Sequence, residues 1–142
     1  MKHNNKGFTF VEILAVIVII GVLMSISIIG VSKYKEKAKD KDYEALALAS
    51  KNAMQEYMMT HPYENRATLK KLVEENLLSN RQDPGDNRKE CSGNVIVEKH
   101  DSANGNIQDG TYTVNICCAS HKIAYIYPNG SEEPITDEAV CN

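Results

Sequence analysis

The fold is decided by the stretch Phe8-Thr-Phe-Val-Glu-Ile-Leu-Ala-Val-Ile-Val-Ile-Ile-Gly-Val-Leu-Met24, which opens an apolar segment that continues to Val31. Within this segment Glu12 is the only ionisable residue, and no proline interrupts the run. As an α-helix rising ~1.5 Å per residue, it would be about 36 Å long, which is enough to cross a hydrocarbon core of roughly 30 Å. Residues 8–31 are therefore predicted to form a single transmembrane helix.

Two plainer kinds of membrane segment compete with this prediction. A cleaved secretory signal peptide is disfavoured, because the apolar region is too long and no Ala-x-Ala-like site follows it. A simple signal anchor, which would hold a domain on the membrane without assembling, is compatible with hydropathy alone.

Glu12 is the informative residue of the segment. A carboxylate inside a membrane helix costs roughly 2.5–3.5 kcal/mol at the bilayer centre, and buried charge persists where something pairs with it. The span itself holds no basic residue. If the chain is cut after Gly7, Phe8 acquires an α-amine that is cationic near neutral pH. That amine, set beside Glu12 of a neighbouring copy, would neutralise the carboxylate.

Lys6-Gly7-Phe8-Thr-Phe-Val-Glu12-Ile13, followed by the apolar run, resembles the prepilin signature of type IV pilins and type II secretion pseudopilins. The resemblance covers residues 6 to about 31. It implies that residues 1–7 are a leader peptide removed after Gly7 by a prepilin peptidase. It also implies N-methylation of Phe8 by the same enzyme and a role for Glu12 in setting subunit register.

The segment departs from many type IV pilins at Ile28 and Ile29, where those pilins have a proline. Gly21 and Gly30 are then the positions at which the helix is expected to bend or loosen. Proline-free helices also occur in Gram-positive competence pseudopilins, so the departure bears on the subtype. The resemblance implies as partners copies of the chain and other pilins, the prepilin peptidase, membrane lipid, and an assembly platform with its ATPase.

The lysines that flank the apolar segment conflict with an orientation in which the C-terminal part of the chain lies outside the cytoplasm. Lys2 and Lys6 precede it, whereas five lysines follow it, and a count of basic residues alone would place the C-terminal side in the cytoplasm. The prepilin pattern and the cysteines favour the opposite orientation, with the C-terminal part outside the cytoplasm and assembled into an extracytoplasmic or cell-surface filament. The five lysines are Lys33, Lys35, Lys37, Lys39 and Lys41.

Residues 32–61 are predicted to continue the helix as an amphipathic segment. The stretch from Ser32 to Thr60 lacks glycine and proline and is rich in helix formers, and His61-Pro62 is expected to end it. A coiled-coil stalk is the alternative, but heptads are not sustained. The predicted stripe consists of Tyr34, Ala38, Ala45, Ala49, Ala53 and Tyr57, with Leu46 and Met54 beside it.

Residues 62–142 are predicted to form a globular head, which gives an α+β fold with a small antiparallel sheet on the long helix. A short helix is expected over Thr68–Leu78, and Arg81–Asn87 is read as a turn cluster. Strands are predicted at 95–99, 111–119 and 123–127, and the short connections favour antiparallel neighbours.

Four cysteines lie in the last 52 positions of the chain: Cys91, Cys117, Cys118 and Cys141. An even count in a small domain favours two disulfides and an oxidising compartment over free or metal-binding thiols. Cys117 and Cys118 point to opposite faces of the predicted strand, so they need different partners. Of the three possible connectivities we favour Cys91–Cys118 and Cys117–Cys141.

Catalytic and cofactor motifs are not apparent in the sequence, which favours a protein that is not an enzyme. His3, His61, His100 and His121 have no metal-ligand spacing, so neither a metal site nor a cofactor is expected. Asp101–Asp109 is acidic enough for calcium but lacks the EF-hand order, so a hairpin loop is favoured. Asn129-Gly-Ser is a formal glycosylation site, yet a tight turn is the better interpretation.

Three functions are compatible with these patterns. The leading hypothesis is a structural subunit of a type IV pilus-like filament used in secretion, DNA uptake or adhesion. A minor tip pilin that acts as a binding module is the second, although the weak acidity of the head argues against direct capture of nucleic acid, since phosphate contacts need clustered basic residues. The third is a membrane-anchored exported domain that does not polymerise.

Overall fold

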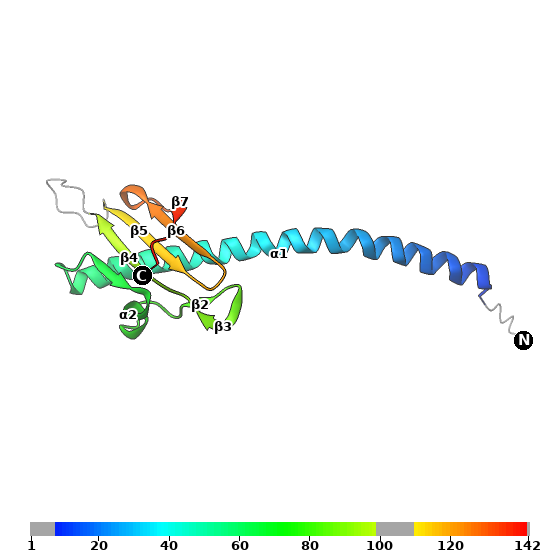
Figure 1. Cartoon of the computed structure of the whole chain (residues 1–142), viewed down its shortest axis with the longest axis horizontal. Helices are drawn as coiled ribbons and strands as arrows, with labels where there is room; N and C mark the ends of the chain where they lie inside the picture. The colour runs from blue at the N-terminus through cyan, green and yellow to red at the C-terminus, as the bar shows by residue number, and fades with distance from the viewer. Residues whose placement is uncertain (1–7, 99–109, 142) are drawn as a thin grey trace, which may run out of the picture. The chain divides into compact units, whose positions relative to one another are not determined.

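The structure of the chain is a computed structural model that describes residues 8–98 and 110–141, apart from the side chains of residues 26–30. The chain divides into two units, residues 1–38 and residues 39–142. One long helix, α1 (Phe10–Thr60), begins in the first unit and ends in the second (Figure 1). The fold is α+β, as the sequence predicts, and α1 ends where His61-Pro62 was expected to stop it.

The described residues of the second unit form two antiparallel sheets. The larger has the strand order β1-β4-β5-β6-β7, and the smaller pairs β2 with β3. Short helical segments connect strands in the described residues, namely α2 (Leu69–Glu74) and η2 (Pro128–Gly130). The strands are β1 (Arg66–Thr68), β2 (Gln82–Asp83), β3 (Asp86–Glu90), β4 (Ser92–Glu98), β5 (Thr111–Cys117), β6 (Lys122–Tyr127) and β7 (Ile135–Glu138).

The three predicted strands correspond to β4, β5 and β6, and they are antiparallel neighbours as expected. Their ends differ from the prediction. The strand β4 starts at Ser92, and β5 stops at Cys117 because the N–H of Cys118 bonds the carbonyl of His121 at 2.9 Å and closes the turn into β6. The part of the predicted strand beyond Glu98, like the acidic loop 101–109, lies outside the described residues.

The hydrophobic core lies between the last turns of α1 and one face of the larger sheet. The predicted stripe on α1 was partly wrong, because Ala45 and Ala49 are exposed and Tyr34 is 78% exposed. The sheet instead covers a neighbouring side of the helix that carries larger apolar side chains and therefore removes more apolar surface from water. This buried side comprises Tyr43, Ala47, Ala53, Met54, Tyr57 and Met58.

The short helix α2 ends earlier than the predicted Leu78. Thr68 is its N-cap residue, and its side chain accepts a hydrogen bond from the N–H of Lys71 at 3.2 Å. At the other end Asn76 adopts a positive φ of 58°, which helical residues do not, and this conformation turns the chain out of the helix. Leu78 is nevertheless buried in the core.

The predicted turn cluster Arg81–Asn87 does contain a turn, at Pro84-Gly85, but the strands β2 and β3 flank it as a hairpin in which Asp83 pairs with Asp86. The Asn129-Gly130 turn was predicted correctly. Both residues have a positive φ, of 52° and 70°, and they connect β6 to β7.

Two disulfides staple the second unit, Cys91–Cys118 and Cys117–Cys141, which are the two pairs favoured from the sequence. Cys91 and Cys118 are buried in the core, whereas Cys141 is exposed. The second bridge and a 3.1 Å hydrogen bond from the N–H of Val140 to Asn115 Oδ1 hold the C-terminal tail against β5. Asn115 and Cys117, on the face of β5 that this tail covers, are both buried.

Candidate assembly site and the buried polar groups of the head

The predicted assembly residues lie at the start of α1. Gly7 precedes the described residues, so the predicted cleavage bond itself is outside them. Phe8 is 81% exposed, and Glu12 lies in the first turn of the helix.

Thr9 and Glu12 form a reciprocal cap that sequence reasoning missed. Both the backbone N–H and the hydroxyl of Thr9 donate to Glu12 Oε2, at 2.9 and 3.0 Å. The N–H of Glu12 in turn donates to Thr9 Oγ1 at 3.3 Å. This is a capping box, for which the Thr-x-x-Glu pattern before an apolar run was an available signal. Glu12 Oε1 accepts no hydrogen bond from the described part of the chain.

Apolar side chains cover every side of the first helical turns and are exposed along α1 up to Met24. Such a surface on a helix needs an apolar partner, either lipid or other helices. Among the described residues, no helix combines the length and the apolarity needed to cross a membrane. The helix continues through Gly21 and Gly30, so the expected bend at these residues remains a prediction.

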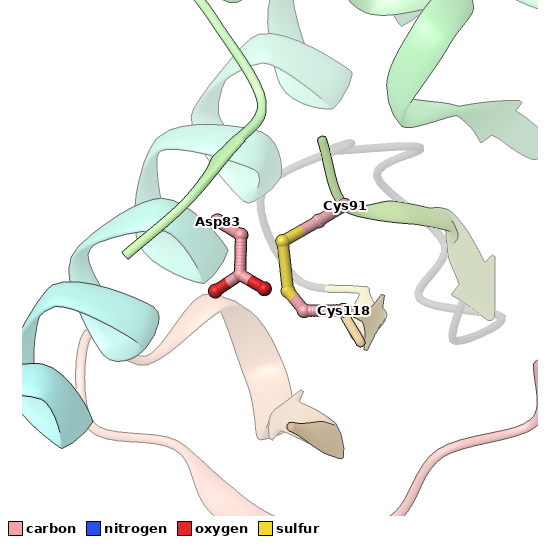
Figure 2. A group of neighbouring side chains, drawn as sticks. All are labelled: Asp83, Cys91 and Cys118. Carbon is pink, nitrogen blue, oxygen red and sulfur yellow. A yellow bond between two sulfur atoms is a disulfide. The ribbon is translucent and has the colours of Figure 1, made fainter. Parts of the chain in front are cut away.

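Asp83 is a buried charge in the head, where it contacts α1 (Figure 2). Its Oδ1 accepts hydrogen bonds from the hydroxyl of Tyr43 at 2.6 Å and from the N–H of Gly85 at 2.7 Å. Burial raises the pKa of Asp83, but the bonds from Tyr43 and from surrounding backbone N–H groups outweigh burial, so the pKa lies below its ordinary value. The carboxylate is therefore ionised at neutral pH.

The carboxylate of Asp83 faces the disulfide between Cys91 and Cys118 (Figure 2). One oxygen and the two sulfur atoms lie within 4.8 Å of one another, a spacing that would suit a metal ion. The two sulfurs are bonded to each other, so they are not available as thiolate ligands. The arrangement thus places a negative charge beside a disulfide.

His121 stacks on Tyr43, with ring centroids 3.7 Å apart and an angle of 4° between the planes. Its Nε2 lies 3.3 Å from the hydroxyl of Tyr125. Burial lowers the pKa of His121, although Asp40 and Asp83 oppose this effect. His121 is thus a packed aromatic residue of the head, and His61 is another, stacked on Tyr57. His3 and His100 lie outside the described residues.

Lys51 is a second buried charge that the sequence did not reveal. Its Nζ donates to the carbonyls of Gly130 and Ser131 at 3.0 and 3.1 Å, and it lies 5.4 Å from the ring centroid of Tyr127. Burial lowers the pKa of Lys51, partly offset by Glu132. The residue ties α1 to the turn between β6 and β7.

Three further side chains join the end of α1 to α2. Tyr57 donates to Glu64 Oε2 at 2.5 Å, and Lys71 bonds the same oxygen at 3.1 Å. Lys71 Nζ also lies 5.0 Å from the centroid of the Tyr57 ring. These contacts fix the connection after the helix and hold no group in a position for chemistry.

The sheet face opposite α1 carries a shallow groove of about 320 Å³ beneath the C-terminal tail. Ile96, Ala124 and Ile126 form its apolar part, and Asn115 donates to Asn94 Oδ1 at 3.1 Å on its floor. Neither a nucleophile with an adjacent base nor a set of metal ligands lines it, so the groove suggests no catalytic chemistry.

Comparisons with known proteins point to the N-terminal segment. Residues 2–28 match the family model described as the prokaryotic N-terminal methylation motif. No curated protein and no solved structure matches the chain.

Proposed function

We propose that this chain, whose N-terminal segment carries the signature of type IV pilins and pseudopilins, is a structural subunit of a type IV pilus-like filament. The motif supports processing by a prepilin peptidase and assembly with other pilins. In this proposal the chain is held in the membrane by residues 8–31 before it joins the filament.

The observation that carries the proposal is the environment of Glu12. Thr9 donates two hydrogen bonds to one carboxylate oxygen of Glu12, Oε2. The other oxygen, Oε1, accepts no hydrogen bond from the described residues. After cleavage at Gly7–Phe8, the new amine of Phe8 on a neighbouring copy would supply the missing partner. An ion pair formed in an apolar environment is strong because little solvent screens it, so contact between copies would relieve the cost of the buried acid.

The exposed apolar surface of α1 supports the same mechanism. Side chains such as Phe10 and Val11 are more than two-thirds exposed in the isolated chain, at 77% and 72%. Packing among copies of the helix would remove this surface from lipid or water. The two disulfides favour an oxidising compartment for the head, which agrees with a head outside the cytoplasm.

Mass spectrometry of the protein purified from its native host tests the processing step. The expected N-terminus is Phe8 with one added methyl group. An N-terminus at Met1 in the working protein would contradict the proposal and leave the anchored-domain interpretation.

Substitution of Glu12 tests the assembly step. Glu12→Gln removes the charge and keeps the size, and it should leave membrane insertion intact while lowering the amount of subunit in sheared filaments by at least tenfold. Glu56→Gln is the matched control, because Glu56 is an exposed acid on the same helix. Filaments that form normally with Glu12→Gln would contradict the role assigned to Glu12.

A further inference from the structure

The second unit contains a cavity of about 340 Å³ at the side of α1, separate from the groove beneath the C-terminal tail. Asp40 and Glu44 of α1 line one wall, and His121 and Tyr125 line another. Ile123, Pro134 and Thr136 complete the lining. The cavity therefore joins two carboxylates to a largely aromatic and apolar wall.

The cavity is lined by two acidic side chains and by no lysine or arginine. All salt bridges among the described residues lie between residues 64 and 90, so none reaches Asp40 or Glu44. Burial and these two carboxylates raise the pKa of Tyr125 to about 12. A concave site lined by one sign of charge, with walls of low polarity, concentrates ions of the opposite sign.

The helix α1 itself carries the complementary charge. Lys33, Lys37 and Lys41 recur every four residues and so share one side of the helix, which we call the basic stripe. All three are exposed, and no salt bridge within the described ranges involves them. Like charges at this spacing destabilise a helix by about 0.2–0.5 kcal/mol per pair, and carboxylates of a second copy would relieve this repulsion.

We propose that the cavity lined by Asp40, Glu44, His121 and Tyr125 receives lysine side chains from the basic stripe of a second copy of this chain. The lysine stem packs on the aromatic wall, and its ammonium group meets the two carboxylates. A contact between different surfaces of two copies is heterologous, and such contacts propagate into open filaments when they do not close into a ring. The inference rests on the proposed function, to which it adds a second contact besides Glu12.

Charge reversal in the full chain tests the contact. Asp40→Lys with Glu44→Lys reverses the cavity, and Lys33→Glu with Lys37→Glu reverses the stripe. Each pair should lower the yield of sheared filaments at least fivefold, and the four substitutions together should restore it to within twofold of the unaltered chain. Lys122→Glu and Glu133→Lys, which change exposed charges elsewhere on the head, are matched controls and should not change the yield.

The outcomes separate the two proposals. No filaments from the unaltered chain would overturn the proposed function and this inference with it. Normal filaments from the reversed pairs, or no recovery in the combined variant, would overturn the contact and leave the proposed function standing. Each variant is first checked for both native disulfides, which report a folded head.

Engineered cysteines test the same contact without reversing charge, so the contact can be tested even if a charge-reversed variant does not fold. All four native cysteines are in disulfides, so the new thiols meet no free native thiol, and intact native bridges are confirmed by peptide mass spectrometry. Two differently tagged copies, one with Lys37→Cys and one with Glu44→Cys, should form a disulfide-linked heterodimer in filaments. A yield no higher than that of Lys37→Cys with Lys70→Cys, which lies on α2, would overturn the contact.

Discussion

The hydroxyl of Tyr43 donates a 2.6 Å hydrogen bond to Oδ1 of Asp83, and both residues are buried although they lie 40 positions apart in the chain. The bond joins the long helix to the hairpin of β2 and β3, which has little apolar surface of its own. A buried carboxylate is costly unless donors satisfy it, so the position of the hairpin depends on this contact.

Tyr43→Phe should therefore destabilise the head. The substitution removes the hydroxyl and leaves the buried carboxylate with one donor fewer, and hydrogen bonds to charged groups contribute about 1.5–3 kcal/mol. We expect the free energy of unfolding to fall by about 2 kcal/mol in urea titrations of the full chain in detergent at pH 7. Tyr34→Phe, on an exposed part of the same helix, should change it by less than about 0.5 kcal/mol. Equal effects of the two would contradict this account.

The ionisation of Asp83 predicts how stability depends on pH. The pKa of Asp83 is lower in the folded protein than its ordinary value of 3.8, so its contribution to stability is fully present above that value. The contribution is lost as the pH falls through the lower, folded pKa, because the unfolded chain then binds more protons. In Asp83→Asn, the free energy of unfolding measured at acidic pH should therefore fall less steeply as the pH is lowered. An unchanged pH dependence in this variant would show that other carboxylates cause the loss of stability in acid.

The contact between Tyr43 and Asp83 also marks the limit of what the sequence predicts. Helix propensity and the His61-Pro62 stop define α1, and period-two alternation finds β4, β5 and β6, because these signals are local. Asp83 stood in an apparent turn cluster, and nothing near it in the sequence indicates that Tyr43 approaches it. Tertiary contact alone makes it a buried acid.

Short edge strands were missed for a related reason. The strands β1 and β7 contain three and four residues, so β1 is too short for its alternation to be recognised, and β7 is exposed throughout and does not alternate. In the sequence, nothing distinguishes Lys51 from the other lysines of the helix, and only the fold places two backbone carbonyls beside it. At the N-terminus, by contrast, the Thr9–Glu12 cap was encoded locally and could have been predicted.

The two disulfides should differ in reactivity. Cys91–Cys118 is buried beside the negative charge of Asp83, which repels an attacking thiolate and disfavours a leaving one, whereas Cys141 is exposed. Under limiting dithiothreitol, Cys117–Cys141 should be reduced at least tenfold faster, as followed by alkylation and peptide mass spectrometry. Asp83→Asn should speed reduction of Cys91–Cys118 and leave Cys117–Cys141 unchanged. Equal rates for both bridges in the native protein would refute this difference.

Tyr127→Phe should leave the protein as stable or make it more stable. The Tyr127 hydroxyl is fully buried and has no hydrogen-bond partner among the described residues, so its removal relieves the cost of desolvating it. We expect a gain of up to about 1 kcal/mol in the free energy of unfolding. Tyr125→Phe is the control, because that hydroxyl lies near His121 Nε2 and its loss should be destabilising. A clear loss of stability in Tyr127→Phe would reveal a partner for its hydroxyl.

Gly93 in β4 should tolerate no side chain. Its φ is +137°, which side chains of L-residues rarely adopt, and a Cβ there would lie 1.9 Å from the carbonyl oxygen of Asn115 on β5. Gly93→Ala must therefore separate the two central strands or strain the backbone, at a cost of about 3 kcal/mol or more. Gly21→Ala is the matched control, because no atom lies within 4 Å of a Cβ added there and alanine favours a helix. In urea titrations Gly93→Ala should lower the unfolding midpoint of the head sharply and reduce the yield of the native Cys91–Cys118 bridge. Gly21→Ala should change neither quantity, and a head that unfolds normally with Gly93→Ala would disprove the close approach of β4 and β5.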